Sequence, residues 1–180
     1  MKIDLHIHSR SCSDGAMTLD EIFNEAFKRK IRVMSVTDHD SIDCQETALD
    51  LARDFGITYV VGLEMNVSFS LPEFQGGKPV YLDFLAYDFD FHHPPLVDKL
   101  RTLREHRRKR AERIFENLNR ELTREGKDPF TGTDMEAIEQ SVDGAFGRPH
   151  IADYMVRKGV VADRREAFDR WKLKSGILKA

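Results

Sequence analysis

The sequence predicts a mixed α/β fold in which a mostly parallel sheet is followed by an all-helical region. Up to about residue 93, short apolar strand-like segments alternate with amphipathic helical segments, an order typical of a parallel sheet with helices on its faces. After Pro94 and Pro95 the strand pattern stops and a long helical period begins. The length of 180 residues suits one domain with a subdomain.

In the first half, apolar runs and capping signals predict the elements in order. A short strand, Lys2–Leu5, runs into the sequence His6-Ile7-His8. The next helix begins at Thr18, because Thr18-Leu19-Asp20-Glu21 is a capping box. The other elements expected are strands at 31–36, 57–63 and 80–87, and a helix that Asp43 and Glu46 open and that ends near Gly56.

In the second half, the periodicity predicts helices only. An apolar stripe at helical spacing runs from Leu96 to Glu125, and Gly126 ends it. Thr133 caps a short helix, Pro149 begins the next one, and Asp163 with Glu166 opens the last. We therefore expect a sheet region at 1–93, a helical subdomain at 94–173 and a tail at 174–180.

Residues that can bind metal follow each of the first three expected strands. His6 and His8 are two residues apart on an extended strand, so their imidazoles point to the same side. His39 follows the second strand, Glu64 ends the third, and Asp14 lies in a polar turn. The carboxyl ends of parallel strands meet at one edge, and a histidine and carboxylate cluster there suits two or more divalent ions. Taken singly, each residue could instead start a turn or cap a helix.

Together these motifs resemble the polymerase and histidinol phosphatase (PHP) family, and within it the stand-alone phosphoesterase branch. The resemblance extends from residue 3 to about residue 170. The motifs that carry it are His6-x-His8, Ser13-Asp14-Gly15, Thr37-Asp38-His39-Asp40, Gly62-Leu63-Glu64, Gly147-Arg148-Pro149-His150-Ile151-Ala152, Gly159 and Glu166-Ala167-Phe168.

The resemblance implies a distorted seven-stranded β/α barrel with a helical insert, and a phosphoesterase that uses a metal-activated hydroxide. It implies two or three divalent ions, of manganese, iron or zinc, with Glu64 as the bridging carboxylate. Glu64 and His39 are the expected catalytic residues. Asp38 and Asp40 are expected to orient the ring of His39. The implied metal ligands are His6, His8, Asp14, His39, Glu64 and His150.

The sequence departs from the family pattern in two places. Asp83 stands where the family has a histidine four residues before a tyrosine, here Tyr87. It is either a metal ligand that alters the metal preference or a polar residue on a half-buried strand. The later family motifs, an Ala-His-Pro-like segment and a terminal Asp-x-His, do not occur before Ala180. We therefore expect an incomplete barrel, in a chain that is a homo-oligomer or a fragment of a longer protein.

Basic residues gather on the long helix, in the run His106-Arg107-Arg108-Lys109-Arg110 with Arg101, Arg104 and Arg113 nearby. This run is either a solvated helix face or a phosphate-recognition surface, since the planar arginine fork matches phosphate oxygens. Arg148, next to His150, is the better single candidate for binding the phosphate of a substrate.

The expected substrate is a small phosphorylated, nucleotide-like molecule: a nucleotide bisphosphate, a phosphomonoester or a short oligonucleotide. Nucleic acid is expected only as such an oligonucleotide substrate. Three alternatives stay open. The sequence Asp4-Leu5-His6-Ile7-His8 also fits an amidohydrolase-type metal hydrolase. The missing motifs fit a non-catalytic metal-binding domain, and the basic helix fits a nucleic-acid-binding module.

Composition and cysteine content predict a soluble cytoplasmic protein. The residues are 41% hydrophobic and 33% charged, and the net charge is −3. No apolar run approaches the roughly 20 residues of a membrane span, so we expect no membrane partner. Two cysteines, Cys12 and Cys44, do not form a disulfide framework, and Cys12 is expected as a reduced thiol.

Overall fold

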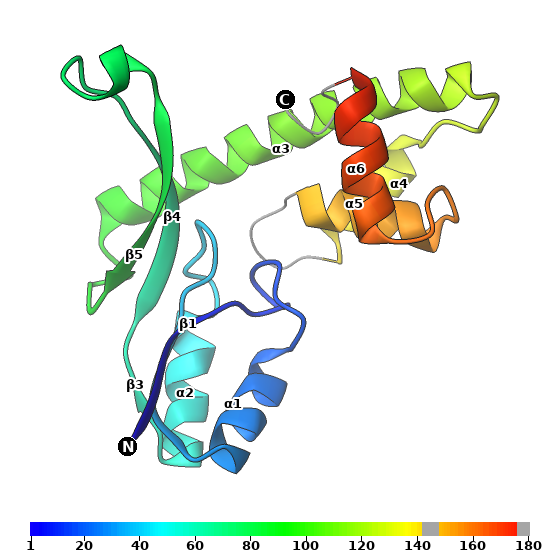
Figure 1. Cartoon of the computed structure of the whole chain (residues 1–180). Coiled ribbons are helices and arrows are strands. Elements are labelled where there is room, and N and C mark those ends of the chain that lie inside the picture. Colours follow the sequence, from blue (N-terminus) through cyan, green and yellow to red (C-terminus); the bar gives the residue numbers. More distant parts are fainter. Residues whose placement is uncertain (142–147, 176–180) are drawn as a thin grey trace. The chain divides into compact units, whose positions relative to one another are not determined.

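The computed structural model describes residues 1–141 and 148–175 and divides the chain into two units, Met1–Leu100 and Arg101–Ala180 (Figure 1). Gly147 and most of the expected tail lie outside the described residues. The division into 1–93, 94–173 and 174–180 stays a prediction. Within the part that is described, no helix has the length and apolar character needed to cross a membrane.

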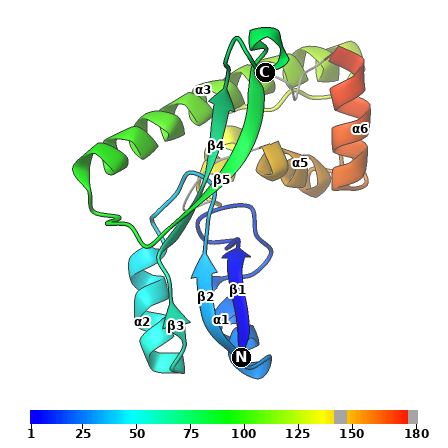
Figure 2. The same cartoon turned by 60° about the vertical axis from the view of Figure 1, so that its left-hand side comes forward.

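The first unit contains a three-stranded parallel sheet in the order β1-β2-β3 (Figure 2). Two helices connect its strands. Consecutive parallel strands joined by right-handed crossovers place both helices on the same face, and the core of this unit lies between helices and sheet, around Phe23, Met34 and Ala48. The elements are β1 (Lys2–Ile7), α1 (Leu19–Lys28), β2 (Ile31–Val36), α2 (Gln45–Phe55) and β3 (Thr58–Tyr59).

The predicted start of α1 and the predicted end of α2 are confirmed, whereas Cys44, and not Asp43, precedes the first residue of α2. Thr18 caps α1: its hydroxyl oxygen accepts from the backbone N–H of Glu21 at 3.3 Å, and the Glu21 carboxylate accepts from the Thr18 N–H at 2.8 Å. At the end of α2, Gly56 adopts the left-handed conformation with φ 62°, which glycine accepts without a steric penalty.

The single strand predicted at 57–63 is wrong. The strand is interrupted after β3, and a new strand, β4 (Gly62–Phe69), begins three residues later. The side-chain amide of Gln45 fills the break: Nε2 donates to the carbonyl oxygens of Val36 (3.0 Å) and Gly62 (2.8 Å). Gly62 also approaches β2 so closely that a Cβ would lie 2.0 Å from Ser35 Oγ. A side chain thus replaces the continuous pairing that the local pattern predicts.

The strands β4 and β5 (Val80–Tyr87) form a separate antiparallel ribbon, from Gly62 opposite Tyr87 to Phe69 opposite Val80. A short 3-10 helix, Gln75–Gly77, lies between them. The predicted parallel continuation through 80–87 is therefore wrong, although the bounds of that strand are confirmed. The mixed α/β class is confirmed, but the described residues contain only five strands in two sheets and no seven-stranded barrel.

Cys12 and Cys44 form a disulfide, so the expectation of a reduced thiol at Cys12 is wrong. The loop after β1 and the residue before α2 converge, and the two Cα atoms lie 6.0 Å apart. Both residues are buried, at 3% and 5% exposure, in the core of the first unit. The cysteines therefore no longer support a cytoplasmic location, because disulfides are rare there.

The described part of the second unit is helical around an apolar core. The long helix predicted at 96–125 is confirmed as α3, which begins in the first unit. Thr131, not Thr133, caps α4, in a capping box with Asp134. Ile114, Leu118 and Met155 are completely or almost completely buried in the core. The helices are α3 (Pro94–Arg124), α4 (Gly132–Glu139), α5 (Arg148–Arg157) and α6 (Arg164–Ser175).

Candidate metal centre

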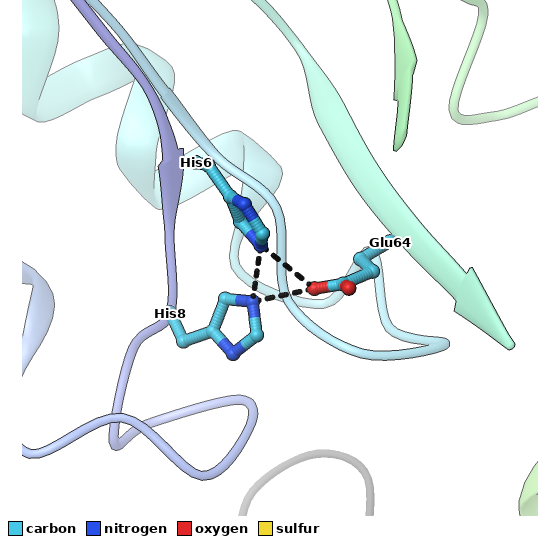
Figure 3. Close-up of side chains that lie close together, drawn as sticks. All are labelled: His6, His8 and Glu64. Carbon is cyan, nitrogen blue, oxygen red and sulfur yellow. Dashed lines mark hydrogen bonds and ion pairs between the residues drawn. The ribbon is translucent and has the colours of Figure 1, made fainter. Parts of the chain in front are cut away.

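The end of β1 presents two imidazoles to one carboxylate oxygen of Glu64 (Figure 3). His6 is in β1 and His8 directly follows it, and the extended backbone keeps both rings on one side. The Nε2 atoms of His6 and His8 are 3.2 Å apart. They lie 3.0 Å and 2.6 Å, respectively, from Glu64 Oε2. Three atoms with lone pairs or protons thus converge on one small space.

Glu64 is buried, with 4% of its surface exposed, near the beginning of β4. Its backbone is bonded to the segment after β2: the Glu64 N–H donates to the carbonyl of Asp38 at 3.2 Å, and the Asp40 N–H donates to the carbonyl of Glu64 at 2.8 Å. These bonds form an isolated parallel bridge between His39 and Glu64. Glu64 therefore lies near the beginning of a strand and not at its end, yet it lies beside His39 as the sequence motifs predict.

A second group shares His8 with the first. The Nδ1 atom of His8 lies 3.1 Å from Asp14 Oδ1, and His39 Nε2 lies 4.0 Å from the same oxygen. The rings of His8 and His39 meet edge to face, with centroids 4.4 Å apart. Within each group, His6–His8–Glu64 and His8–Asp14–His39, all candidate ligand atoms lie within 4.8 Å of one another.

The loop that carries Asp14 is held by Ser9 and Asp38, both fully buried. Ser9 donates to Asp38 twice, from its backbone N–H and its hydroxyl, each at 2.7 Å. Asp38 thus anchors the loop, a role that differs from the predicted orientation of the His39 ring. Gly15 is required in this loop because a Cβ there would lie 2.0 Å from the carbonyl oxygen of His8. Ser9 was not among the predicted site residues, although it belongs to the polar turn Ser9–Gly15, which was a signal for it.

The ionisable side chains of the cluster shift one another's pKa values. The hydrogen bond to Asp14 is the largest cause that raises the pKa of His8 above its usual value, with Glu64 adding to the effect. In return, the His8 hydrogen bond holds the pKa of Asp14 well below its usual range. Burial raises the pKa of Asp38 to about 6, against the opposing effect of its bonds from Ser9.

The donor set fits divalent metal ions. Nδ1 of His39 is buried and finds no hydrogen-bond partner among the described residues, and it lies 3.6 Å from Glu64 Oε2. A buried ring nitrogen without a partner is costly unless something binds it. Imidazole nitrogens with carboxylate oxygens are the ligands of zinc, manganese and iron sites in proteins. An ion among these side chains would use the lone pair of His39.

Five of the predicted site residues are brought together within the first unit. Asp83 lies opposite Asn66 in the β4–β5 ribbon and accepts a hydrogen bond from the Asn66 side chain. It belongs to none of the candidate metal groups found among the described residues. His150 and Arg148 lie in α5 of the second unit. Metal binding by Asp83 and His150, and substrate binding by Arg148, stay predictions.

Comparison with known proteins identifies one family and several relatives. The profile of the family described as PHP domain matches residues 4–151. A 5'-3' exoribonuclease of Haemophilus influenzae is 28% identical over 99% of this chain and 60% of its own length. A 3',5'-nucleoside bisphosphate phosphatase of Chromobacterium violaceum is 30% identical over 94% of this chain and 54% of its own length. The chain thus spans little more than half of each relative.

Two solved structures share this fold. A protein named as a metal-dependent phosphoesterase of Bifidobacterium adolescentis matches 98% of this chain and 57% of its own, with 26% identity and a TM-score of 0.77. A protein named as an amidohydrolase of Chromobacterium violaceum, with bound sulfate, matches 93% of this chain and 54% of its own, with 29% identity and a TM-score of 0.72. These likenesses extend over both units of the chain.

Proposed function

Because this chain belongs to the PHP domain family, we propose that it is a metal-dependent phosphoesterase that hydrolyses nucleotide-like phosphate esters. One observation carries the proposal: the side-chain nitrogens of His6 and His8 converge on one oxygen of buried Glu64, with His39 beside it. Relatives named as an exoribonuclease and as a nucleoside bisphosphate phosphatase support the substrate class. Nucleotide bisphosphates, phosphomonoesters and short oligonucleotides are the candidates.

We assign two or three divalent ions of manganese, iron or zinc to this site. His6, His8 and Glu64 would hold one ion. The group of His8, Asp14 and His39 would hold a second ion. Bound ions would neutralise charge on the phosphoryl oxygens and lower the pKa of water. Glu64 and His39 are the proposed catalytic residues, because they would hold the ions in place. His150 and Asp83 are proposed as further ligands, and Arg148 as the residue that orients the phosphate.

The protein's own contribution is the rigidity of the ligand set. The double hydrogen bond from Ser9 to Asp38 fixes the loop that carries Asp14, and the backbone bonds of Glu64 fix that carboxylate against the His39 segment. A preorganised ligand set loses little entropy when it binds ions and substrate.

We also propose that the chain forms part of the distorted seven-stranded barrel of its family, with the helices of the second unit as the insert. The apolar face of the β4–β5 ribbon supports this, because it forms an exposed pocket and Phe84 is 56% exposed. Further strands, or a second copy in a homo-oligomer, would cover that face. The nucleotide-like substrate supports a cytoplasmic location. The pocket is lined by Met65, Val67, Ser68, Phe69, Leu82 and Phe84.

An amidohydrolase remains the second candidate, because a solved neighbour carries that name. The two reactions differ in the bond that is cleaved. Turnover of an amide in preference to a phosphate ester would favour this candidate. Bound metal without any turnover would favour a non-catalytic metal-binding domain.

The test is elemental analysis and phosphate release on the purified chain. We expect near-stoichiometric manganese, iron or zinc, lost in Glu64→Gln and in His8→Ala. Even residues behind a ligand typically contribute about 10- to 100-fold to metal affinity or activity, so both variants should lose more than about 100-fold in phosphate release from a nucleoside 3',5'-bisphosphate.

Two exposed side chains of the first unit provide matched controls for these variants. They are Glu46 and His92, whose side chains are 77% and 67% exposed. They are of the same residue types as Glu64 and His8 but lie outside the cluster. Glu46→Gln and His92→Ala should keep both metal and activity. Equal metal content in Glu64→Gln and in wild type would contradict the assignment of the site.

A further inference from the structure

We propose that Tyr87 is a positioning residue of the metal centre, because its hydroxyl fixes the backbone of β1 directly before the ligand His6. The tyrosine is the last residue of β5, and its hydroxyl donates to the carbonyl oxygen of Leu5 at 2.8 Å. All three residues lie in the first unit. The inference rests on the metal site of the proposed function and deepens it, by naming a residue outside the ligand set that determines how tightly one ion is held.

His6 is the most exposed member of the two ligand groups. Its side chain is 52% exposed, whereas those of His8 and His39 are 21% and 24% exposed. The His6 ring is hydrogen-bonded to His8 and Glu64, which are candidate ligands themselves (Figure 3). The surrounding protein therefore encloses this imidazole less than the others, and its orientation depends on the backbone that carries it.

The pairing of β1 with β2 does not hold this backbone evenly. Among the strands that the structure describes, β1 lies at the edge of its sheet and pairs with β2 alone. The register of the two strands is irregular between Asp4 and Ile7, the stretch that contains Leu5 and His6. Bulges, one form of such irregularity, redirect side chains and occur often beside active sites. A peptide group in this stretch needs further hydrogen bonds to keep one orientation.

Two side chains bond the peptide group between Leu5 and His6. Its carbonyl oxygen accepts from the Tyr87 hydroxyl, and its N–H donates to Asp4 Oδ1 at 3.4 Å. The bond to Asp4 is long and stays within β1, so it cannot fix the strand relative to its neighbours. The bond from Tyr87 is shorter and comes from the other sheet, so it fixes the main chain of His6 relative to the β4–β5 ribbon.

The Tyr87 bond links the two sheets that supply the ligands of one ion. His6 comes from β1, whereas Glu64 comes from β4, which pairs with β5. The backbone bonds of Glu64 run to Asp38 and Asp40 in the segment after β2, and not to β1. The direct bond between β5 and β1 thus sets the distance of 3.0 Å between His6 Nε2 and Glu64 Oε2.

Cobalt binding to the purified chain tests the proposal. A chelator removes bound metal, and the chain is titrated with Co²⁺, whose visible absorption reports the geometry of the sites that it occupies. The test variant Tyr87→Phe removes the hydroxyl and keeps the ring. The matched control is Tyr81→Phe in the same strand, because Tyr81 is 83% exposed. Circular dichroism and the thermal midpoint of the metal-free proteins check that each variant is folded.

We expect Tyr87→Phe to weaken Co²⁺ binding at the His6–His8–Glu64 group by about tenfold, the lower end of the loss that is usual for residues behind a ligand. The ion of the other group, which does not contain His6, should keep its affinity to within about twofold. The absorption of the weakened site should also change, because the His6 imidazole is displaced. Tyr81→Phe should bind Co²⁺ like wild type.

A double-mutant cycle with His6→Ala separates positioning from a general effect on stability. Since Tyr87 acts through His6, adding Tyr87→Phe to His6→Ala should change the affinity for Co²⁺ by less than about twofold. A purely structural role would weaken both ions and would add to the loss that His6→Ala causes. Equal Co²⁺ affinity of Tyr87→Phe and wild type, or a loss that is the same with and without the His6 imidazole, would overturn the proposal.

Phosphate release from a nucleoside 3',5'-bisphosphate separates this inference from the proposed function. A wild type that binds Co²⁺ in the expected manner but releases no phosphate would remove the proposed function and leave the role of Tyr87 standing. A wild type that hydrolyses the bisphosphate, together with normal Co²⁺ binding by Tyr87→Phe, would keep the proposed function and remove the inference. Absence of Co²⁺ binding by wild type would overturn both.

Discussion

The two units of the chain bury different kinds of side chain. Among the described residues, the second unit has a core of apolar side chains from its four helices, with Asp134 as its buried charged residue. The first unit buries nine polar or charged side chains beside its apolar core. They are Ser9, Ser13, Ser35, Thr37, Asp38, Asp40, Ser41, Gln45 and Glu64.

The difference shows which kind of interaction holds each unit together. Burying a polar group costs free energy unless a partner satisfies it, whereas burying an apolar group is favourable directly. The polar groups of the first unit hold backbone segments and ligand side chains, as Gln45 does for Gly62 and Asp38 does for Ser9. A substitution should therefore act through a cavity in the second unit and through lost hydrogen bonds in the first.

The largest expected effect is Leu118→Ala in the second unit. Leu118 is 1% exposed at the centre of the apolar core, and truncating a buried leucine costs about 2–5 kcal/mol of unfolding free energy. Hydrogen exchange measured by mass spectrometry should accelerate in peptides of α3, α4 and α5. The ion assigned to His6, His8 and Glu64 should be retained, because all three ligands lie in the first unit, and complete loss of metal in this variant would show that the two units are not energetically separable.

The next effect is reduction of the Cys12–Cys44 disulfide. The bond closes a loop with a sequence separation of 32 residues, and a crosslink of that span contributes about 3–4 kcal/mol by restricting the unfolded chain. A dithiol reductant should lower the thermal midpoint of the first unit. Because Cys12 lies between His8 and Asp14, metal retention should fall as well.

The double variant Cys12→Ala/Cys44→Ala is the control for this experiment. It should be insensitive to the reductant and resemble reduced wild type. An unchanged thermal midpoint of wild type on reduction, with free thiols verified by alkylation, would contradict the stabilising role of the bond.

Gln45→Met should cost less, about 1–3 kcal/mol, which is the cost of leaving buried polar groups without partners. The side chain keeps its length but no longer bonds the carbonyls of Val36 and Gly62. Urea unfolding followed by hydrogen exchange should locate the loss in β2 and the beginning of β4. The exposed Gln140→Met should change stability by less than about 0.5 kcal/mol. A similar loss in both variants would show that the gap between the strands does not depend on Gln45.

The sequence predicts those features that depend on neighbouring residues. The capping box at Thr18, the strand Ile31–Val36 and the long helix α3 all follow from local patterns. The shared side of His6 and His8 follows from the two-residue period of a strand, whereas Glu64 reaches them from near the beginning of β4 and not from the carboxyl end of a parallel strand.

Contacts between distant residues were not predictable from such patterns. The break before β4 depends on Gln45, 17 residues away from Gly62, and its signal is absent from the apolar run at 57–63. The antiparallel pairing of β4 with β5 and the disulfide between Cys12 and Cys44 depend on chain geometry in the same way. Two cysteines without a known fold give no distance between them.

The smallest expected effect concerns Asp134, the charged residue of the apolar unit. Its carboxylate accepts from the Tyr154 hydroxyl at 2.6 Å and from the Thr131 N–H at 2.6 Å, and it lies 2.9 Å from Lys158 Nζ. These bonds, the one from Tyr154 above all, hold the pKa of Asp134 well below its usual range. The Lys158 side chain is 49% exposed, so water screens that ion pair and keeps its contribution small.

A folded-state pKa below the unfolded value means that the unfolded chain binds more protons in acid. The stability from Asp134 should therefore be complete above about pH 5 and decline as the pH falls below about 4, the unfolded value of an aspartate. Urea unfolding of wild type and Asp134→Asn at pH 7, 5, 4 and 3 measures this, with hydrogen exchange reporting on α4 and α5. The difference between the two proteins should be constant at pH 7 and 5 and shrink at pH 4 and 3. If the difference in unfolding free energy does not change with pH, the negative charge of Asp134 does not stabilise the second unit. The stability of that unit would then come from apolar packing and from hydrogen bonds that do not depend on charge.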